Sequence, residues 1–368
     1  MPTKSKVVVG MSGGVDSSVA AYLLQQQGYD VIGVTLKFWS DSCLARSHEK
    51  CCGPQSISDA RLVAHRLGIP HFILDEAEAF EEEVISPFVE QYRRGLTPNP
   101  CALCNEKMKF GRLPRKASAW GAEYVATGHY ARIERSERET RLKKAKDERK
   151  DQTYFLFRLE RKTLDRMLTP LGDYSKEEVR DLARQAGLSI WDKEESQGIC
   201  FIPGNQYETF LAERLGSGKE AAGEIVDLTG KLLGHHRGIE SYTVGQRRGL
   251  PGGQGKPLYV VDIDPEKQRI VAGPWEALHR THCYLIDTNW QQPVPMGPLP
   301  VTAKVRYNYP AAPAQLTLLP GRRARIDFVH PQAGVAPGQA AVCYIDDLLL
   351  GGGWIERTAD SPRWETAP

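Results

Sequence analysis

The chain has 368 residues, of which 41% are hydrophobic and 26% are charged, and its formal net charge is +2. This composition predicts an ordinary globular protein, and the length predicts two or three domains. No stretch approaches the ~20 unbroken apolar residues of a membrane span, and the N-terminal residues are typical of a strand rather than a secretion signal. We therefore expect a cytoplasmic protein with no membrane partner.

Buried strands and amphipathic helices alternate in the first part of the chain. Strands are expected at 6–10, 31–37, 71–74 and 123–126, and helices at 17–27, 56–67 and 79–92. This β-α-β order predicts a doubly wound α/β domain, whose parallel sheet carries helices on both faces and binds its ligand at the carboxyl ends of the strands. The segment Thr127-Gly128-His129-Tyr130 follows the last of these strands, so its polar side chains should lie at that edge.

Beyond about residue 205, glycine and proline become frequent and the apolar runs shorten, so helices should largely disappear. Strands are expected at 224–227, 258–263, 269–272, 301–307, 323–329 and 339–344. They predict two small β domains, the second a β-barrel. The expected domains are residues 1–205, 206–275 and 276–358, followed by a polar tail at 359–368.

The motif SGGVDSS stands at residues 12–18, between the first strand and the first helix. Adjacent glycines let the backbone turn tightly and point its N–H groups at an anion, while the hydroxyls and the helix start add further donors. The motif lacks the Gly-Lys-Ser/Thr ending of a Walker loop and the G-x-G-x-x-G spacing of a dinucleotide fold. It predicts a phosphate-binding loop, against the alternative of a plain glycine-rich turn.

Eight cysteines, two of them in a Cys-x-x-Cys pair, fit metal or redox chemistry better than a secreted disulfide framework. The pair is Cys101 and Cys104 in the segment NPCALCN, ahead of a helix expected from Lys107, and Cys200 stands in SQGICF. Lys107, Lys109 and the helix start could lower the pKa of Cys104 and make it nucleophilic. The alternative is a structural pair or a buried thiol.

The near-neutral charge neither requires nor excludes nucleic acid, because binding depends on how basic residues cluster. The strongest basic run is RLKKAKDERK at 141–150, in which six basic residues outweigh two acidic ones. It could contact nucleic acid, or it could be the solvated tip of a hairpin or a helix face.

Seven motifs occur in order along nearly the whole chain: SGGVDSS, TPNPCALCN, ATGHY, KDQTYFL, SQGICF, GQRRGL and PGQ. Together they resemble the bacterial tRNA-specific 2-thiouridylase family, whose loop is that of the ATP pyrophosphatase group. The resemblance implies an adenine-nucleotide hydrolase-like fold and a tRNA-uridine 2-sulfurtransferase. Such an enzyme adenylates the C2 oxygen of the wobble uridine and then transfers sulfur from a protein persulfide, or from cluster-bound sulfide, to give 2-thiouridine, AMP and pyrophosphate.

The resemblance also implies the site residues, with Cys104 as nucleophile and Cys200 as the carrier of persulfide sulfur. Magnesium is expected with the polyphosphate of ATP, and Asp16 is a candidate ligand. The implied partners are tRNA and a sulfur donor protein, either a cysteine desulfurase or a relay. The implied ATP-binding residues are Gly10, Met11, Ser12, Gly13, Gly14, Val15, Asp16, Ser17, Leu36 and Gly128. The implied tRNA-binding residues are Asn99, Pro100, Cys101, His129, Lys150, Asp151, Gln152, Arg306, Tyr307 and Gln339.

One position departs from the family, since members often carry Asp where this chain has Cys101, and that Asp is a candidate acid-base group. Cys101, Cys104 and Cys200 could instead hold three irons of a four-iron cluster whose fourth iron binds hydrosulfide. In the rival route a persulfide forms on Cys200, and Cys104 closes a disulfide as sulfur is released. We favour the persulfide route and keep the iron-sulfur cluster, with Cys101 as the third thiol, as the alternative.

The remaining thiols and two histidines carry weaker signals. A thiol-rich patch favours a structural or redox loop over a zinc site, because adjacent cysteines give awkward tetrahedral geometry. Its members are Cys43, His48, Cys51 and Cys52. Cys283 and Cys343 stand in expected strands and should be core residues, whereas His235 and His236 should lie in a surface turn.

Two other functions explain part of the pattern. An amide-forming or ammonia-using ligase of the same ATP group would explain the loop but not the cysteines. A non-catalytic RNA-binding protein would explain the basic run and the barrel, but it does not need the motif SGGVDS. Pyrophosphate release that depends on both tRNA and a sulfur donor separates the three functions.

Overall fold

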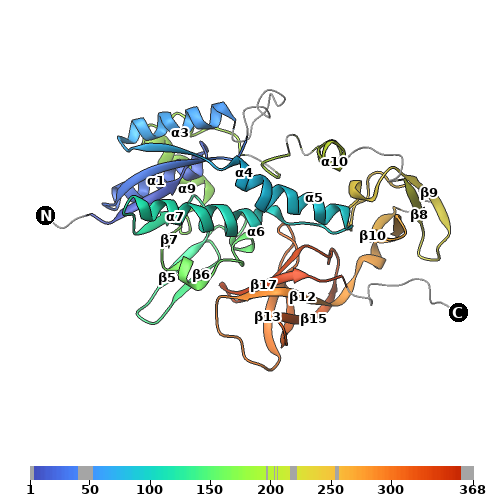
Figure 1. The fold of residues 1–368 in the computed structure, drawn as a ribbon. Coiled ribbons are helices and arrows are strands. Elements are labelled where there is room, and N and C mark those ends of the chain that lie inside the picture. Colours follow the sequence, from blue (N-terminus) through green and yellow to red (C-terminus); the bar gives the residue numbers. More distant parts are fainter. Residues whose placement is uncertain are drawn as a thin grey trace. The chain divides into compact units, whose positions relative to one another are not determined.

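The computed structural model describes residues 4–39, 53–195, 198–202, 204, 206–215, 222–252 and 257–357 (Figure 1). The chain divides into two compact units, each made from more than one stretch. The first unit is Met1–Ile85, Pro100–Asn205 and Asp347–Leu349, and the second is Ser86–Asn99, Gln206–Asp346 and Leu350–Pro368. The division into three domains stays a prediction, and the stretch Ser86–Asn99 groups with the second unit.

A five-stranded parallel sheet forms the centre of the first unit, in the order β3, β2, β1, β4, β7. Its strands are β1 (Lys6–Gly10), β2 (Asp30–Lys37), β3 (His71–Asp75), β4 (Tyr124–Ala126) and β7 (Met167–Leu168). The first four match the strands predicted from the apolar runs. The edge strand β7 has only two residues, too short a run to be recognised in the sequence.

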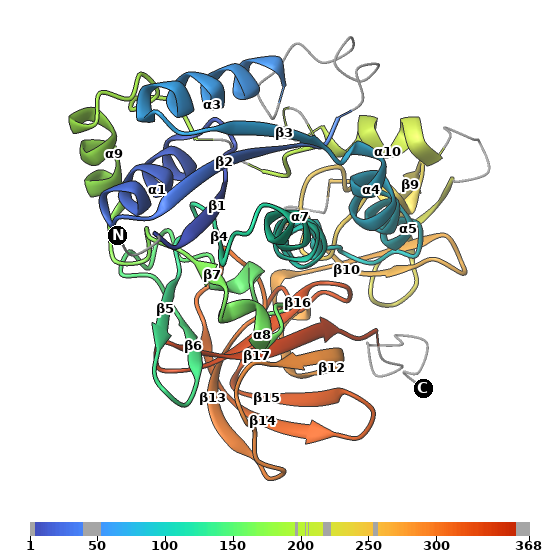
Figure 2. The same ribbon diagram turned by 60° about the vertical axis from the view of Figure 1, so that its left-hand side comes forward.

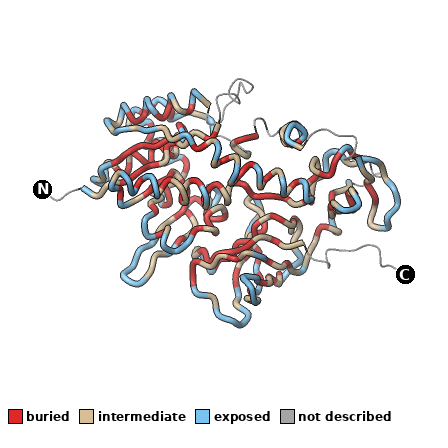
Figure 3. The backbone as a smooth tube through the Cα atoms, viewed as in Figure 1, coloured by how far each residue is buried: buried red, intermediate tan, exposed pale blue. Residues whose placement is uncertain are grey.

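Side chains alternate along β1, and this alternation explains why helices cover both faces of the sheet. The covering helices are α1 (Val15–Gln26), α3 (Pro54–Leu67), α7 (Leu113–Ala119) and α9 (Lys176–Gln185). Val7 and Val9 pack into one apolar cluster with α1, α3 and α9, whereas Val8 packs on the opposite face with α7. Figure 2 shows the helices on the two sides of the sheet, and Figure 3 shows the buried strands between them. The predicted doubly wound fold is confirmed.

Two predicted helices are composites that contain π-helical turns. After residue 99, α6 (Pro100–Cys104) continues directly into the π-helix η2 (Asn105–Arg112) and then into α7. The helix therefore begins with α6 rather than at Lys107 as predicted, because proline suits the first helical position. Gly111 permits the wide π turn, since a Cβ there would lie 2.7 Å from the carbonyl oxygen of Glu106. The helix expected at 79–92 consists of α4 (Ala77–Phe80), η1 (Glu81–Ile85) and α5 (Ser86–Arg93).

A four-stranded sheet forms one part of the second unit, in the order β10, β11, β8, β9. Its strands are β8 (Gly223–Val226), β9 (Leu232–His236), β10 (Tyr259–Asp264) and β11 (Arg269–Gly273). The helix α10 (Tyr207–Leu215) is an exception to the expected loss of helices after residue 205. His236 is buried in β9, and its Nδ1 accepts a hydrogen bond from the Gly238 N–H at 3.1 Å. The predicted surface turn is therefore wrong for His236. His235 is exposed as predicted, but it lies in the strand β9 rather than in a turn.

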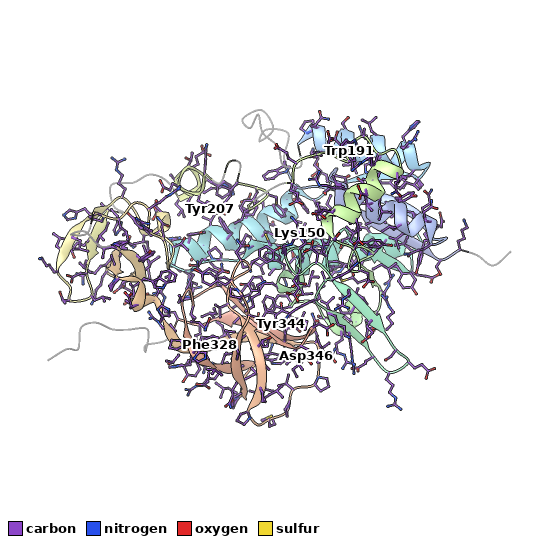
Figure 4. All side chains as sticks on the ribbon, turned by 180° about the vertical axis from the view of Figure 1, so that it is seen from behind. Lys150, Trp191, Tyr207, Phe328, Tyr344 and Asp346 are labelled. Carbon is purple, nitrogen blue, oxygen red and sulfur yellow. The ribbon has the colours of Figure 1, made fainter. Side chains whose placement is uncertain are left out.

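A closed barrel forms the other part of the second unit. Its strands follow one another in the order β12, β15, β14, β13, β16, β17, and pairing of β17 with β12 closes it. They are β12 (Arg280–Trp290), β13 (Leu299–Lys304), β14 (Ala312–Leu319), β15 (Arg323–Gln332), β16 (Ala340–Ile345) and β17 (Leu348–Ile355). Phe328 and Tyr344, labelled in Figure 4, come from two of these strands. The predicted barrel is confirmed, and Cys283 and Cys343 are buried in it as expected.

The basic run at 141–150 begins in a hairpin. The sequence left three interpretations of this run open, namely a contact with nucleic acid, the tip of a hairpin and a helix face. The hairpin is formed by the antiparallel strands β5 (Arg132–Arg135) and β6 (Thr140–Lys143), and the run continues beyond β6. Five basic side chains of the run pair with carboxylates; Lys146 Nζ, for example, lies 3.3 Å from Glu178 Oε1. In the described part of the chain, none of the helices has the length and hydropathy that a bilayer span would require.

Candidate active site

The loop with the motif SGGVDSS connects β1 to α1 at the carboxyl end of the sheet. Gly14 is the N-cap residue of α1, and no described side chain caps the helix there. The first N–H groups of a helix have no partner within it, so they are available to an anion. The Ser17 hydroxyl orders the loop, because it accepts a hydrogen bond from the Ser12 N–H at 3.1 Å and donates to the Gly14 carbonyl oxygen at 3.2 Å. The loop has the geometry that phosphate binding requires.

Close backbone contacts hold this loop from two sides. Gly13 has φ +72°, and a Cβ there would lie 2.1 Å from the carbonyl oxygen of Ser56 on α3. Gly128, which follows β4, approaches so closely that a Cβ would lie 2.6 Å from the Ser17 nitrogen. Lys193 adds a hydrogen bond from its Nζ to the Gly13 carbonyl oxygen at 2.9 Å. The structure thus places the predicted loop and Gly128 side by side.

The other predicted ATP-binding residues lie at the same strand ends. Gly10 ends β1, Met11 follows it and is buried, and Leu36 lies near the end of β2. The roles of these residues in ATP binding stay predictions.

Asp16 is the acidic residue of the loop, and one of its oxygens accepts two hydrogen bonds. Oδ1 accepts from the Tyr130 hydroxyl at 2.8 Å and from Lys176 Nζ at 2.6 Å. Burial, together with the Asp16 carboxylate, raises the pKa of Tyr130, so its hydroxyl remains a donor. The Asp16 side chain is 34% exposed. Magnesium is bound in proteins by one or two carboxylates plus phosphate oxygens, so the partly exposed Asp16 carboxylate has the donor chemistry for it, and its role as a ligand stays a prediction.

The three motif cysteines all belong to the first unit and are present as thiols. Cys104 is buried at the end of α6, and Cys101 is half-buried one helical turn earlier. Cys200 is half-buried, and its neighbour Phe201 packs with its ring 5.8 Å from that of Phe80. The Cys200 segment is thereby anchored near the end of α4.

Burial dominates the acidity of Cys104. It raises the pKa of the thiol to about 11, Lys109 opposes this shift, and Cys101 adds to it. Burial also raises the pKa of Cys101, again with Lys109 in opposition. Lys109 lowers the pKa of Cys104 as the sequence suggested, but burial outweighs this effect. The expected net lowering is therefore contradicted, and Cys104 is the buried thiol that the sequence left open as the alternative.

Lys109 is the cation whose charge acts on the pKa values of both thiols of the pair and of His129. It follows Cys104 by five residues, the hydrogen-bonding period of the π-helix η2. Burial and then Lys109 lower the pKa of His129 well below its usual value, so the imidazole is neutral at physiological pH. Its Nδ1 lies 2.7 Å from the Thr127 hydroxyl oxygen. The predicted tRNA contact of His129 would thus be made by a neutral ring.

Among the described residues, no three side chains of His, Cys, Asp or Glu are placed to hold a metal ion together. Cys101, Cys104 and Cys200 are all described and therefore do not form a site for a single metal ion. Their role as ligands of a four-iron cluster stays a prediction. Several residues of the sequence analysis lie outside the described residues: Cys43, His48, Cys51, Cys52, Ser196 and Gln197.

Three predicted tRNA contacts follow β6 at residues 150–152. Lys150 Nζ lies 2.6 Å from Glu195 Oε2 and remains 33% exposed. Asp151 is buried and accepts a backbone hydrogen bond within its own loop. Gln152 Oε1 accepts from the Tyr130 N–H at 3.0 Å. Asp151 and Gln152 therefore shape this segment, while Lys150 presents a cation at the surface of the first unit.

Four other predicted tRNA contacts belong to the second unit: Asn99, Arg306, Tyr307 and Gln339. Gln339 donates from Nε2 to the carbonyl oxygen of Thr97 at 3.2 Å and to that of the next residue at 3.1 Å. Arg306 donates from Nε to the Gly334 carbonyl oxygen at 2.8 Å. Both side chains hold the local backbone, and tRNA contact by all four residues stays a prediction.

Family comparisons cover nearly the whole chain. Residues 5–204 match the model of the tRNA methyl transferase HUP domain, residues 208–274 the tRNA methyl transferase PRC-barrel domain, and residues 280–355 the aminomethyltransferase beta-barrel domain. A Clostridium botulinum protein (strain Langeland) named tRNA-specific 2-thiouridylase MnmA 1 is 45% identical over 96% of this chain and 100% of its own length. Proteins named tRNA-specific 2-thiouridylase MnmA are 44% identical in Clostridium perfringens and 45% in Geobacter metallireducens, over 96% of this chain and 99% and 97% of theirs. The chain belongs to the tRNA-specific 2-thiouridylase family.

Membership of the thiouridylase family confirms the resemblance carried by the seven motifs. The charged residues beside the loop were nevertheless not predicted, because they stand outside the motifs and carry little local signal. These residues are Asp59, Lys176, Lys193 and Glu195. Only Lys193 and Glu195 carried a signal, because they stand just before the motif SQGICF in the sequence.

Replacing Gly128 with alanine should weaken ATP binding. The added Cβ would lie 2.6 Å from the Ser17 nitrogen and would push the loop away. Overpacking costs about 1–3 kcal/mol, which corresponds to roughly 5- to 150-fold in affinity. Calorimetric titration with α,β-methylene ATP measures the change. Gly53→Ala is the control, because its Cβ would meet nothing within 4 Å, and an equal loss in both variants would contradict the contact.

Alkylation of Cys104 by iodoacetamide should accelerate with pH and should slow when Lys109 is replaced by glutamine. The thiolate is the reactive form, and a pKa of about 11 keeps it a small fraction at neutral pH. The rate should rise about tenfold per pH unit in neutral to mildly alkaline solution. Mass spectrometry of the Cys104 peptide follows the reaction, and Lys107→Gln is the matched control that should keep the parent rate. A rate that levels off near neutral pH would contradict the raised pKa.

Proposed function

We propose that this chain is a tRNA-uridine 2-sulfurtransferase that uses ATP to replace the C2 oxygen of the wobble uridine with sulfur. The observation that carries the proposal is its 44–45% identity, over 96% of the chain, to proteins named tRNA-specific 2-thiouridylase. The phosphate loop and the placement of Cys104 and Cys200 in one unit agree with such chemistry.

Activation of the base is the task of the phosphate loop. The C2 oxygen of uridine is a poor leaving group, so it first attacks the α-phosphorus of ATP, the bond to the bridging oxygen breaks, and pyrophosphate departs. The base then carries AMP on its C2 oxygen. The N–H groups at the start of α1, with the hydroxyls of Ser12 and Ser17, are the donors that would stabilise the phosphate charge.

Asp16 would hold the magnesium ion that accompanies the polyphosphate, and the ion would neutralise part of the phosphate charge. Within the protein, Lys176 pairs with this carboxylate at 2.6 Å. The loop therefore meets an incoming polyphosphate with its carboxylate already compensated by a cation.

Sulfur transfer is the task of the two thiols. Cys200 receives a persulfide from a donor protein, either a cysteine desulfurase or a relay. The terminal sulfur attacks C2, the bond from C2 to oxygen breaks, and AMP leaves with that oxygen. The Cys104 thiolate then attacks the Cys200 sulfur, which releases 2-thiouridine and closes a disulfide that an external thiol reduces. Lys109 is the cation that favours the thiolate of Cys104.

The substrate base must leave the anticodon stack to meet this chemistry. Lys150 offers a phosphate contact from the first unit, and the predicted contacts of the second unit extend the tRNA-binding surface. With tRNA as the substrate, the cytoplasm is the expected location. We assign the chemistry to residues 1–205 and tRNA binding partly to the β domains 206–275 and 276–358.

Steady-state pyrophosphate release should depend on both tRNA and a sulfur donor. Asp16→Ala should abolish it while leaving tRNA binding nearly intact, because the carboxylate acts on the polyphosphate. Cys200→Ser should give at most one burst of pyrophosphate and no thiolation, because adenylation precedes sulfur transfer. An enzyme-coupled pyrophosphate assay and mass spectrometry of tRNA nucleosides measure the two steps. Pyrophosphate release by Asp16→Ala at the parent rate would refute the role of the loop.

Cys101→Asp should retain thiolation with a persulfide donor, because the persulfide route needs only Cys104 and Cys200. Cys104→Ser is the contrasting variant and should lose thiolation. Iron content after anaerobic purification is measured beside activity. A parallel fall of iron and activity in Cys101→Asp would replace the persulfide route with the cluster route.

A further inference from the structure

A chain of ion pairs connects the phosphate loop to Lys150, which is labelled in Figure 4. Asp16 Oδ1 lies 2.6 Å from Lys176 Nζ, and the same nitrogen lies 3.0 Å from Glu195 Oε1. The other oxygen of Glu195, Oε2, lies 2.6 Å from Lys150 Nζ. The four side chains alternate in charge, and all belong to the first unit.

These pairs are better fixed than ordinary surface ion pairs, which contribute little. The Lys176 side chain is 11% exposed, and the Lys176 N–H donates to Asp147 Oδ2 at 3.3 Å. The Asp147 carbonyl oxygen also accepts from the Lys150 N–H at 3.0 Å. One buried residue thus holds the backbone of both lysines. Burial acts to raise the pKa of Glu195, but hydrogen bonds from Lys150 and Lys176 outweigh it and lower the pKa, so Glu195 stays ionised.

Two of these four ion-paired side chains each contact two partners of opposite charge. Lys176 shares one ammonium group between the carboxylates of Asp16 and Glu195, and Glu195 shares one carboxylate between two lysines. If Lys150 leaves Glu195, the carboxylate loses one of its cations and attracts Lys176 more strongly. A tRNA phosphate is the ligand that would draw Lys150 away, because phosphates compete for exposed lysines.

We propose that Glu195 is a positioning residue that couples tRNA binding to the ATP loop. A tRNA phosphate takes Lys150, Lys176 shifts toward Glu195, and the Asp16 carboxylate is released for the cation that accompanies ATP. The coupling rests on the proposed function, since it assumes a tRNA contact at Lys150 and ATP in the loop. It makes full engagement of ATP depend on bound tRNA, so that ATP is not cleaved without a base to activate.

The coupling predicts two variants with different signatures. Lys150→Gln imitates the tRNA-bound state, so the free variant should bind magnesium and an ATP analogue more tightly than the parent. Glu195→Gln removes the carboxylate that attracts Lys176, so Lys176 stays on Asp16 and tRNA no longer alters analogue affinity.

The test is calorimetric binding of α,β-methylene ATP with magnesium to the full chain, with and without a saturating tRNA transcript. For the parent, tRNA should tighten binding about fivefold or more, the lower end of common coupling between sites. The ratio of the analogue's affinity with tRNA to its affinity without tRNA should fall to about one in Glu195→Gln and in Lys150→Gln. In both variants tRNA binding no longer changes the state of the loop, so it cannot change the affinity for the analogue. Glu177→Gln is the matched control, because this exposed carboxylate is the sequence neighbour of Lys176 on α9. It should keep the parent ratio.

Distinct outcomes overturn distinct claims. If the parent binds both ligands but shows no coupling, or if Glu195→Gln keeps the parent ratio, the role of Glu195 is overturned and the proposed function stands. If the parent fails to bind the analogue or the tRNA, the proposed function falls and the coupling falls with it. If Glu195→Gln does not fold, Lys150→Gln decides, since a parent-like analogue affinity in the free variant overturns the coupling.

Discussion

The backbone contact between Gly128 and the loop at Asp16 and Ser17 is the constraint on which the rest of the site depends. There is no room for a side chain, because a Cβ on Gly128 would lie 2.6 Å from the Ser17 nitrogen. The contact exists because β1 and β4 pair directly in parallel and release the chain at the same edge of the sheet. Two residues after Gly128, Tyr130 reaches the Asp16 carboxylate. The strand order thereby fixes which residues can touch the loop.

Electrostatic balance is the second requirement of this loop. A helix start attracts anions, yet Asp16 stands in the first turn of the helix and would repel a polyphosphate if its charge were uncompensated. Lys176 removes this conflict by pairing with Asp16, and Lys193 pairs with Asp59 at 2.5 Å while donating to the loop backbone. In the protein alone, the carboxylates of Asp16 and Asp59 are thus each compensated by a lysine, although Lys176 is shared with Glu195. With these carboxylates paired, the electrostatic attraction for a phosphate comes chiefly from the N–H groups of the loop.

The sheet and the loop could be predicted from the sequence because their signals are local. Apolar runs of strand length and a glycine pair between strand and helix require no knowledge of distant residues. The ion pairs of the site could not be predicted, because Lys176 lies 160 residues from Asp16 and Glu195 lies 45 residues from Lys150. The acidity of Cys104 was mispredicted for the same reason, since burial is decided by the whole fold. The start of α6 was missed because the proline of the Asn-Pro-Cys segment was not taken as a first helical residue.

The burial of Cys104 and the cysteine at position 101 act together. A buried thiol with a pKa of about 11 resists oxidation and adventitious alkylation, because both reactions need the thiolate. An ionised aspartate at position 101 would add a negative charge beside this thiol and would compete with it for Lys109. Cys101, whose own pKa is raised by burial, stays neutral and leaves the positive charge of Lys109 to act on Cys104. With a thiol at position 101, the positive charge of Lys109 therefore favours the thiolate of Cys104 more strongly than it would beside an aspartate.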